Sequence, residues 1–167
     1  MKKVVLNEGL QKIGKDSFYG CHALEHINLQ STVTEIGEGA FCSCVGLREV
    51  VLNEKLQTIG EAAFASCISL ECITITIPST VTKISERAFN TCYNLREVEL
   101  HERIQKIGRD SFGTGAFERC SSLERFSFPN LTTRLDIIIK DGKYADVENK
   151  IDDIIVRGSG IRRRCNK

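Results

Sequence analysis

The chain lacks tryptophan, and its 167 residues include only one methionine and two prolines. It also has little net charge, because 23 basic residues oppose 22 acidic ones. That balance argues against a protein built as a whole to grip nucleic acid or an acidic membrane. No apolar run approaches the roughly 18 residues of a membrane-spanning helix. The composition therefore favours one domain with a sizeable core and no membrane insertion.

The start of the chain carries little apolar sequence. It reads MKKVVLNEGLQKIGKDS, with two lysines followed by short apolar stretches. A secretory signal requires an apolar segment of roughly 7–15 residues. We therefore expect a cytoplasmic protein, and an extracellular location stays open if the chain is a fragment of a longer protein.

An internal repeat dominates what the sequence does contain. After a partial copy from Val4 to Cys21, copies begin at Leu24, Leu47, Leu70, Leu95 and Leu123, 23 to 28 residues apart. Each reads L-x-x-[VI]-x-[LI], a turn, [LVI]-x-x-I-[GS], and then x-x-[AS]-F-x-x-C-x-x-L. We place two extra residues of the fourth copy near Pro78 and five in the fifth, at GTGAF. A period of roughly 20–29 residues with this pattern indicates a leucine-rich-repeat solenoid of five to six coils over residues 1–130.

Three columns of the repeat hold a single residue type, which predicts continuous buried stripes in a stack of coils. The columns are Ile13, Ile36, Ile59, Ile84 and Ile107; Phe18, Phe41, Phe64, Phe89 and Phe117; and Cys21, Cys44, Cys67, Cys92 and Cys120.

Each copy predicts three local structures. Val98 and Leu100 alternate with Glu97 and Glu99, which is the period of a strand with one buried face. The glycine that usually follows the isoleucine suits a tight turn. Phe, Cys and Leu then recur three residues apart, and this spacing predicts a single helical turn that closes the coil.

The residues of this motif resemble those of the BspA-like leucine-rich repeats, most closely in the I-G-x-x-A-F-x-x-C runs at 36–44 and 59–67. The resemblance covers residues 1 to about 130. It implies an α/β right-handed coil with a parallel β-sheet on the concave face. It also implies binding through the solenoid surface, often to other proteins, and no intrinsic catalysis. The chain departs from the family pattern in having only Pro78 and Pro129, where the hallmark often has one proline per repeat.

The C-terminal stretch follows a different pattern. Apolar residues at helical spacing predict a helical cap over 131–156, with Asn130 and Asp146 as N-cap residues. Such a cap would cover the open edge of the last coil; a partner-binding or dimerisation helix is the alternative. Residues 157–167 carry five basic residues and no acidic one. We expect a flexible tail there, and contact with nucleic acid or an anionic surface is the alternative.

No catalytic, cofactor or metal site is predicted. The repeat cysteines follow the coil period instead of a C-x-x-C spacing, so we interpret them as small buried core residues rather than zinc ligands. His22 adjoins Cys21, but no motif supplies a third orienting group. Nucleophile-elbow, phosphate-loop and H-E-x-x-H motifs are absent from the sequence. The chain is therefore predicted not to be an enzyme.

The predicted function is recognition of another protein by a monomer, through the outward positions of the strands on the concave sheet. A cell-surface adhesin fragment and an accessory binder acting through the basic tail are the alternatives. The candidate partner-binding residues are Lys3, Val5, Asn7, His26, Asn28, Gln30, Glu49, Val51, Asn53, Thr74, Thr76, Glu97, Glu99, His101 and Arg125, with Cys72 and Ser127 at equivalent outward positions.

Overall fold

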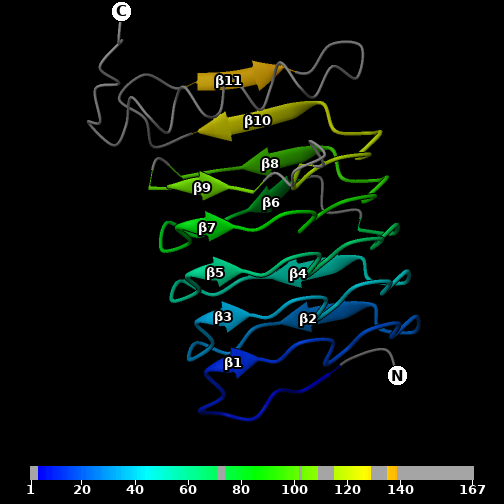
Figure 1. The fold of residues 1–167 in the computed structure, drawn as a ribbon, viewed down its shortest axis with the longest axis vertical. Coiled ribbons are helices and arrows are strands. Elements are labelled where there is room, and N and C mark those ends of the chain that lie inside the picture. Colours follow the sequence, from blue (N-terminus) through cyan, green and yellow to red (C-terminus); the bar gives the residue numbers. More distant parts are fainter. Residues whose placement is uncertain (1–3, 71–73, 102, 109–114, 129–134, 139–167) are drawn as a thin grey trace, which may run out of the picture.

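The computed structural model describes residues 4–70, 74–101, 103–108, 115–128 and 135–138 as coils stacked along one axis (Figure 1). The first coil comprises residues 4–23, the second 24–46, the third 47–69, the fourth 70–94 and the fifth 95–122. The secondary structure of these described ranges consists of β-strands and turns, without an α-helix. Repeats of the sequence therefore correspond to layers of the fold, as predicted.

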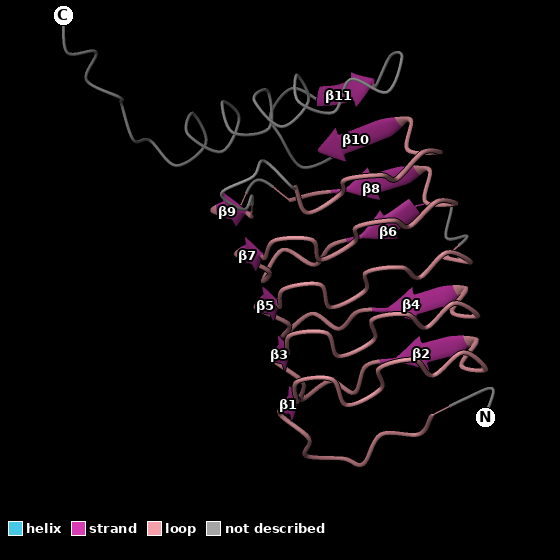
Figure 2. Ribbon diagram, turned by 45° about the vertical axis from the view of Figure 1, so that its right-hand side comes forward, coloured by secondary structure: helices cyan, strands magenta, loops and turns pink. Residues whose placement is uncertain are grey.

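One side of the stack carries the strands predicted from the alternating segments, and we call their outward surface the strand face (Figure 2). Strand β2 forms a parallel pair with β4, and β8 forms parallel pairs with both β6 and β10. The strands are β2 (His26–Asn28), β4 (Glu49–Val51), β6 (Thr74–Thr76), β8 (Glu97–Glu99) and β10 (Arg125–Phe128).

A second parallel sheet runs up the stack in the order β1-β3-β5-β7-β9. Its register pairs each column isoleucine with the next, as in Ile13 with Ile36 and Ile59 with Ile84. The second sheet therefore holds the isoleucine stripe in line. Its strands are β1 (Lys12–Ile13), β3 (Glu35–Ile36), β5 (Thr58–Ile59), β7 (Lys83–Ile84) and β9 (Lys106–Ile107).

The phenylalanine column forms a continuous stack inside the coils. Neighbouring ring centroids lie 5.1–5.3 Å apart, and the ring planes are within 12° of parallel. The rings of Phe41, Phe64 and Phe89 are at most 1% exposed. The predicted buried stripe of phenylalanines is therefore confirmed.

The segment around each phenylalanine is not the helical turn that the spacing predicted. Two residues four apart have positive φ in each of the first four coils, for example Ala62 (49°) and Ser66 (59°). Their backbone N–H groups, and that of Phe64 between them, donate to carbonyl oxygens of the next coil at 2.7–2.9 Å. Every second N–H thus points along the stack, whereas a helix would direct these groups back along its own segment.

The glycines after the isoleucines permit close packing between coils and do not adopt a left-handed backbone conformation. Their φ values are not positive, in contrast to Gly39 at 60°. A Cβ on Gly60 would lie 2.6 Å from the carbonyl carbon of Gly37 and 2.7 Å from the carbonyl oxygen of Ile36. Adjacent coils therefore approach at this column too closely for most side chains.

The extra residues of the fourth coil lie before its strand, which corrects their predicted position near Pro78. Thr74 pairs with Glu97 and Thr76 with Glu99. Counting back along the repeat places the two additional residues between Leu70 and Thr74. Pro78 consequently occupies the regular turn position, level with His101 of the next coil.

The predicted C-terminal helical cap is wrong where the structure describes it. Leu135–Ile138 form a strand, β11, that pairs antiparallel with β10 and sets Phe128 opposite Leu135. The upper edge of β10 offers backbone donors and acceptors, and a strand satisfies them whereas a helix does not. The rest of the predicted cap and the basic tail at 157–167 lie outside the described residues.

Candidate partner-binding face

The strand face presents three rows of outward side chains. Strand pairing defines the first two rows, and the residues two positions after each strand define the third. The first row is His26, Glu49, Thr74, Glu97 and Arg125; the second is Asn28, Val51, Thr76, Glu99 and Ser127; the third is Gln30, Asn53, Pro78 and His101.

Charged residues of the first row pair with one another across adjacent coils. His26 Nδ1 lies 3.2 Å from Glu49 Oε2, with both side chains about half exposed. Arg125 Nη2 donates to both carboxylate oxygens of Glu97 at 2.7 Å. The exposed contact between His26 and Glu49 contributes little to stability. The side chains of Arg125 and Glu97 are less exposed, at 34% and 22%, and their charges balance each other.

The second row is exposed over the lower and middle coils of the strand face. Asn28 and Thr76 are exposed, and the side chain of Val51 is 44% exposed. Ser127, at the upper end of the row, is buried, with 7% of its surface exposed. Recognition by this row would therefore centre on the lower and middle coils.

Asn53 of the third row connects coils through backbone groups. Its amide Nδ2 donates to the carbonyl oxygens of Gln30 at 2.8 Å and Val33 at 2.9 Å, and its Oδ1 accepts from the N–H of Lys55 at 2.7 Å. This amide stabilises the turn after β4. The sequence prediction treated Asn53 as outward surface and missed these contacts, which the Asn-x-Lys spacing alone does not reveal.

Five predicted residues lie at the margins of what the structure describes. Val5, in the first coil, is 80% exposed, and Asn7 is exposed beside it. Lys3 lies outside the described residues, as does Cys72. Thr74 is placed in β6 by its backbone alone.

A pocket of about 240 Å³ opens where β6 and β8 end. Its lining residues include Glu54, Glu99 and His101, together with the apolar Ile77 and Pro78. Glu99 and His101 were predicted face residues. Glu54 was not, because it belongs to the turn of the third coil and only stacking brings it to the same place.

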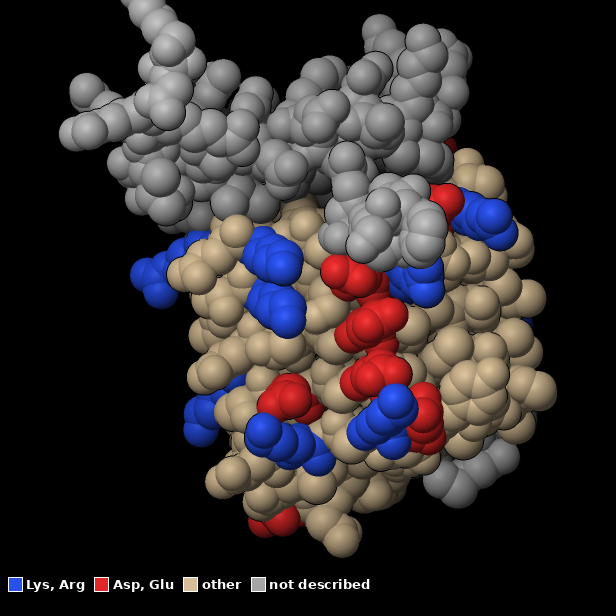
Figure 3. All heavy atoms as spheres, in the orientation of Figure 1, with Lys and Arg blue, Asp and Glu red and all other residues tan. Residues whose placement is uncertain are grey.

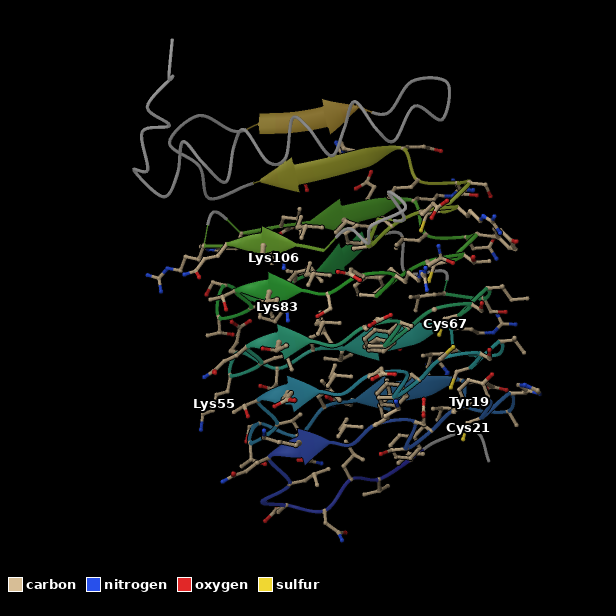
Figure 4. All side chains as sticks on the ribbon, in the orientation of Figure 1. Tyr19, Cys21, Lys55, Cys67, Lys83 and Lys106 are labelled. Carbon is tan, nitrogen blue, oxygen red and sulfur yellow. The ribbon has the colours of Figure 1, made fainter. Side chains whose placement is uncertain are left out.

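A second concavity, of about 320 Å³, runs over the second sheet across β3, β5, β7 and β9. Glu38, Glu61 and Glu86 line it together with Lys83 and Lys106. Figure 3 shows acidic side chains gathered in a vertical band over this face, with basic side chains beside it. Figure 4 shows Lys83 and Lys106 on successive coils on the same side. This groove carries both signs of charge and was not predicted from the sequence.

Large apolar side chains are also exposed on the turn side, which was not among the predicted binding positions. The exposed fractions are 60% for Tyr19, 45% for Tyr93 and 37% for Ile68. Ile68 and Tyr93 each follow a column cysteine. Val45 follows a column cysteine in the same way. The recurrence of large apolar residues at this position of the repeat is the sequence signal that could have predicted the exposed side chains.

The cysteine column makes a ladder of thiol contacts between coils. The Sγ atoms of Cys44, Cys67, Cys92 and Cys120 donate to the carbonyl oxygen of the phenylalanine in the preceding coil at 3.1–3.2 Å. These four side chains are fully buried. Burial raises the pKa of Cys44 to about 11 and the pKa values of Cys67 and Cys92 well above the ordinary value. Their thiols are therefore protonated donors at neutral pH.

Cys21 departs from the predicted buried column, because it is exposed. In the described part of the chain no coil lies below the first one, so nothing covers this thiol (Figure 4). No group of three or more histidine, cysteine or acidic side chains among the described residues could hold a metal ion. The described ranges also contain no helix that is long and apolar enough to span a bilayer.

The family comparison identifies the class to which this architecture belongs. The model for the BspA type leucine rich repeat region matches six copies, over residues 1–114 and 47–139. The chain therefore belongs to the BspA-type leucine-rich-repeat family. Such repeat families are in general not enzymes and act in protein interaction or at surfaces. No curated protein sequence matches the chain.

Solved structures of bacterial leucine-rich-repeat proteins resemble the fold. A leucine rich cell surface protein from Faecalibacterium prausnitzii A2-165 has 27% identity and a TM-score of 0.70, covering 79% of this chain and 33% of that protein. The T. pallidum leucine rich repeat protein has 31% identity and a TM-score of 0.67, and the match covers 75% of this chain and 57% of that protein. A leucine-rich repeat protein from Bacteroides ovatus ATCC 8483 has 29% identity and a TM-score of 0.59, covering 75% and 36%. The chain thus spans from one third to somewhat over half of these proteins.

Proposed function

We propose that the chain is a non-catalytic protein-interaction module that binds a partner protein through its strand face. One observation carries the proposal: the interior phenylalanine, cysteine and isoleucine columns each repeat a single residue type, while exposed positions on the strand face differ from coil to coil. Asn28, Val51 and Thr76 occupy one row with three chemistries. Repetition inside builds the scaffold, and variety outside supplies a surface that can distinguish partners.

The strand face suits a partner with matching polar and apolar contacts more than a strongly charged one. Glu97 and Arg125 of the first row balance each other's charge, so this pair offers little long-range attraction. Val51 gives a central apolar contact between Asn28 and the exposed Thr76. Recognition would therefore rest on close packing and hydrogen bonds in the second row.

Affinity capture from the native source tests the proposal with two matched triple variants. The face variant replaces Asn28, Val51 and Thr76 with lysine; the control variant replaces the exposed Lys12 and Lys83 and the half-buried Thr58 of the second sheet with serine. We expect the intact chain and the control variant to retain the same proteins and the face variant to lose them. Equal retention by the face variant, with melting temperatures unchanged, would contradict the proposal.

The second candidate function is that of a cell-surface adhesin fragment. It is favoured by the likeness to a protein described as a cell surface protein, of which this chain covers 33%. An external location would replace the cytoplasmic one expected from the N-terminal residues. Fractionation of the native cells, with antibody accessibility of the chain on intact cells, decides between the two locations. Protection of the chain until the cells are lysed would reject the adhesin.

A further inference from the structure

The pocket at the ends of β6 and β8 differs in charge from the rest of the strand face. Glu97 is ion-paired with Arg125, and the Glu49 carboxylate lies 3.2 Å from His26 Nδ1. Glu99, half-buried in the second row, has no cationic partner among the described residues, and neither has Glu54. No lysine or arginine of the described chain lines the pocket. Two acidic residues therefore line one cavity that no basic residue of the described chain lines.

His101 adds a third polar group to this cavity. Its Nδ1 atom is buried and has no hydrogen-bond partner in the part of the chain that the structure describes. A neutral imidazole that carries its proton on Nε2 presents an acceptor at Nδ1. A buried polar atom without a partner costs free energy, and a donor from a bound group would remove that cost.

The remaining lining residues are the apolar Ile77, Pro78 and Leu100 together with Thr76 and Ser79. Ile77 and Leu100 are at most 2% exposed, and Pro78 is buried beside them. Such walls suit an alkyl stem, while the acceptors suit a charged donor at the end of the stem. Lysine and arginine combine these two properties. Lys55 follows Glu54 in sequence but does not line the pocket, and Figure 4 shows it at the outer left of the stack.

We propose that this pocket binds the cationic end of a lysine or arginine side chain presented by the partner protein. The inference rests on the proposed function, since it assigns one anchoring contact within the strand face. The alkyl stem packs on Ile77, Pro78 and Leu100, and the terminal N–H groups donate to the carboxylates of Glu99 and Glu54 and to His101 Nδ1.

The intact chain can be tested without its partner. N-acetyl-lysinamide and N-acetyl-argininamide are titrated separately at pH 8, where an ordinary imidazole is neutral. The readout is the NMR signals of the three histidines, with His22 and His26 as internal references. We expect saturable shifts at His101 with at least one cationic probe and none with the uncharged N-acetyl-glutaminamide. Absence of a saturable His101 shift with both cations would overturn the inference.

Matched substitutions assign the binding to the pocket. Glu99→Gln and Glu54→Gln should each weaken probe binding at least about five-fold, the loss expected for one charge-assisted hydrogen bond. Glu86→Gln, on the second sheet, should leave it unchanged. Two pocket variants are used so that a folding defect in one, detected by circular dichroism, leaves the other decisive. Equal affinity in all three variants would also overturn the assignment.

The outcomes separate this inference from the proposed function. If the probes fail to bind while the face variant still loses its captured proteins, the strand face binds a partner without this anchor. If the probes bind at His101 but the face variant retains every protein, the pocket exists and the proposed partner-binding function fails.

Discussion

The first and third coils carry the same motif in different surroundings. Phe64 and Cys67 of the third coil are completely buried, whereas Phe18 is only partly buried and Cys21 is exposed. Gly60 lies against the backbone of the coil below, while a Cβ on Gly14 would meet only Ser17 Oγ at 3.2 Å. The position within the repeat therefore determines the residue type. The position of the coil in the stack determines how deeply that residue is buried and how much it contributes to stability.

The phenylalanine stack gives the largest test of this difference. Phe64→Ala removes a ring packed between two others and should cost about 3–5 kcal/mol of unfolding free energy. Phe18→Ala should cost roughly half of that or less, because its ring has one stacked neighbour and is partly exposed. Urea denaturation followed by circular dichroism measures both. Equal losses would show that the first coil is packed as tightly as the third.

The glycine column gives the next largest effect. Gly60→Ala would force a Cβ into the backbone of the second coil and should cost about 1–3 kcal/mol. Gly14→Ala should change stability by less than about 0.5 kcal/mol, because only a flexible hydroxyl lies nearby. Thermal unfolding of the two single variants makes the comparison. A destabilised Gly14→Ala variant would argue that the first coil requires glycine for another reason.

The thiol ladder predicts a smaller difference. Cys67→Ala removes the donor to the Phe41 carbonyl oxygen and leaves a small cavity, at a cost of about 1–2 kcal/mol. Cys21→Ala should be neutral within about 0.5 kcal/mol, since that thiol is exposed. Native-state labelling with a thiol reagent provides an independent check, because Cys21 should react first and Cys67 only after unfolding. Rapid labelling of Cys67 in the folded chain would contradict the ladder.

Alkaline pH should produce the smallest effect. Burial raises the pKa values of Cys67 and Cys92 in the folded chain, so stability is fully present below the ordinary thiol pKa and falls above it, as unfolded thiols ionise. From pH 8 to pH 9 the loss is about 0.5 kcal/mol for each such thiol. Cys67→Ala should lower this slope relative to that of the unsubstituted chain. Urea midpoints across that range provide the measurement, and identical slopes would contradict the prediction.

Much of the fold was predictable because stacking places equal residues on top of each other. The phenylalanine and isoleucine columns and the strands needed only the repeat period. The extra residues were misplaced because ECITITIPS alternates isoleucine and threonine. A shift of two residues along such a segment keeps every side chain on its correct face, so the alternation cannot distinguish the two registers.

The other errors came from interactions between segments. Leu131, Leu135 and Ile138 fit a helical face, yet β11 forms because the edge of β10 offers pairing that the local pattern cannot anticipate. The helical turn around each phenylalanine was wrong for a similar reason, since its N–H groups bond to the next coil. Local spacing describes a segment alone, whereas these segments are shaped by their neighbours.

The candidate site was predictable only in part. Alternation identified the outward rows, including Asn28, Val51 and Glu99, and partner binding by these residues stays a prediction. The pocket joins Glu54 to His101 across 47 positions of sequence. Its shape depends on where turns of three coils meet, which no single motif encodes.

The place where the fourth coil takes up its additional residues has a wider consequence. The insertion falls between Leu70 and Thr74, while the rings of Phe64 and Phe89 remain 5.3 Å apart. Length changes at this corner are thus uncoupled from the interior. Such corners are natural points at which evolution, or a protein engineer, can graft new loops beside the strand face without redesigning the scaffold.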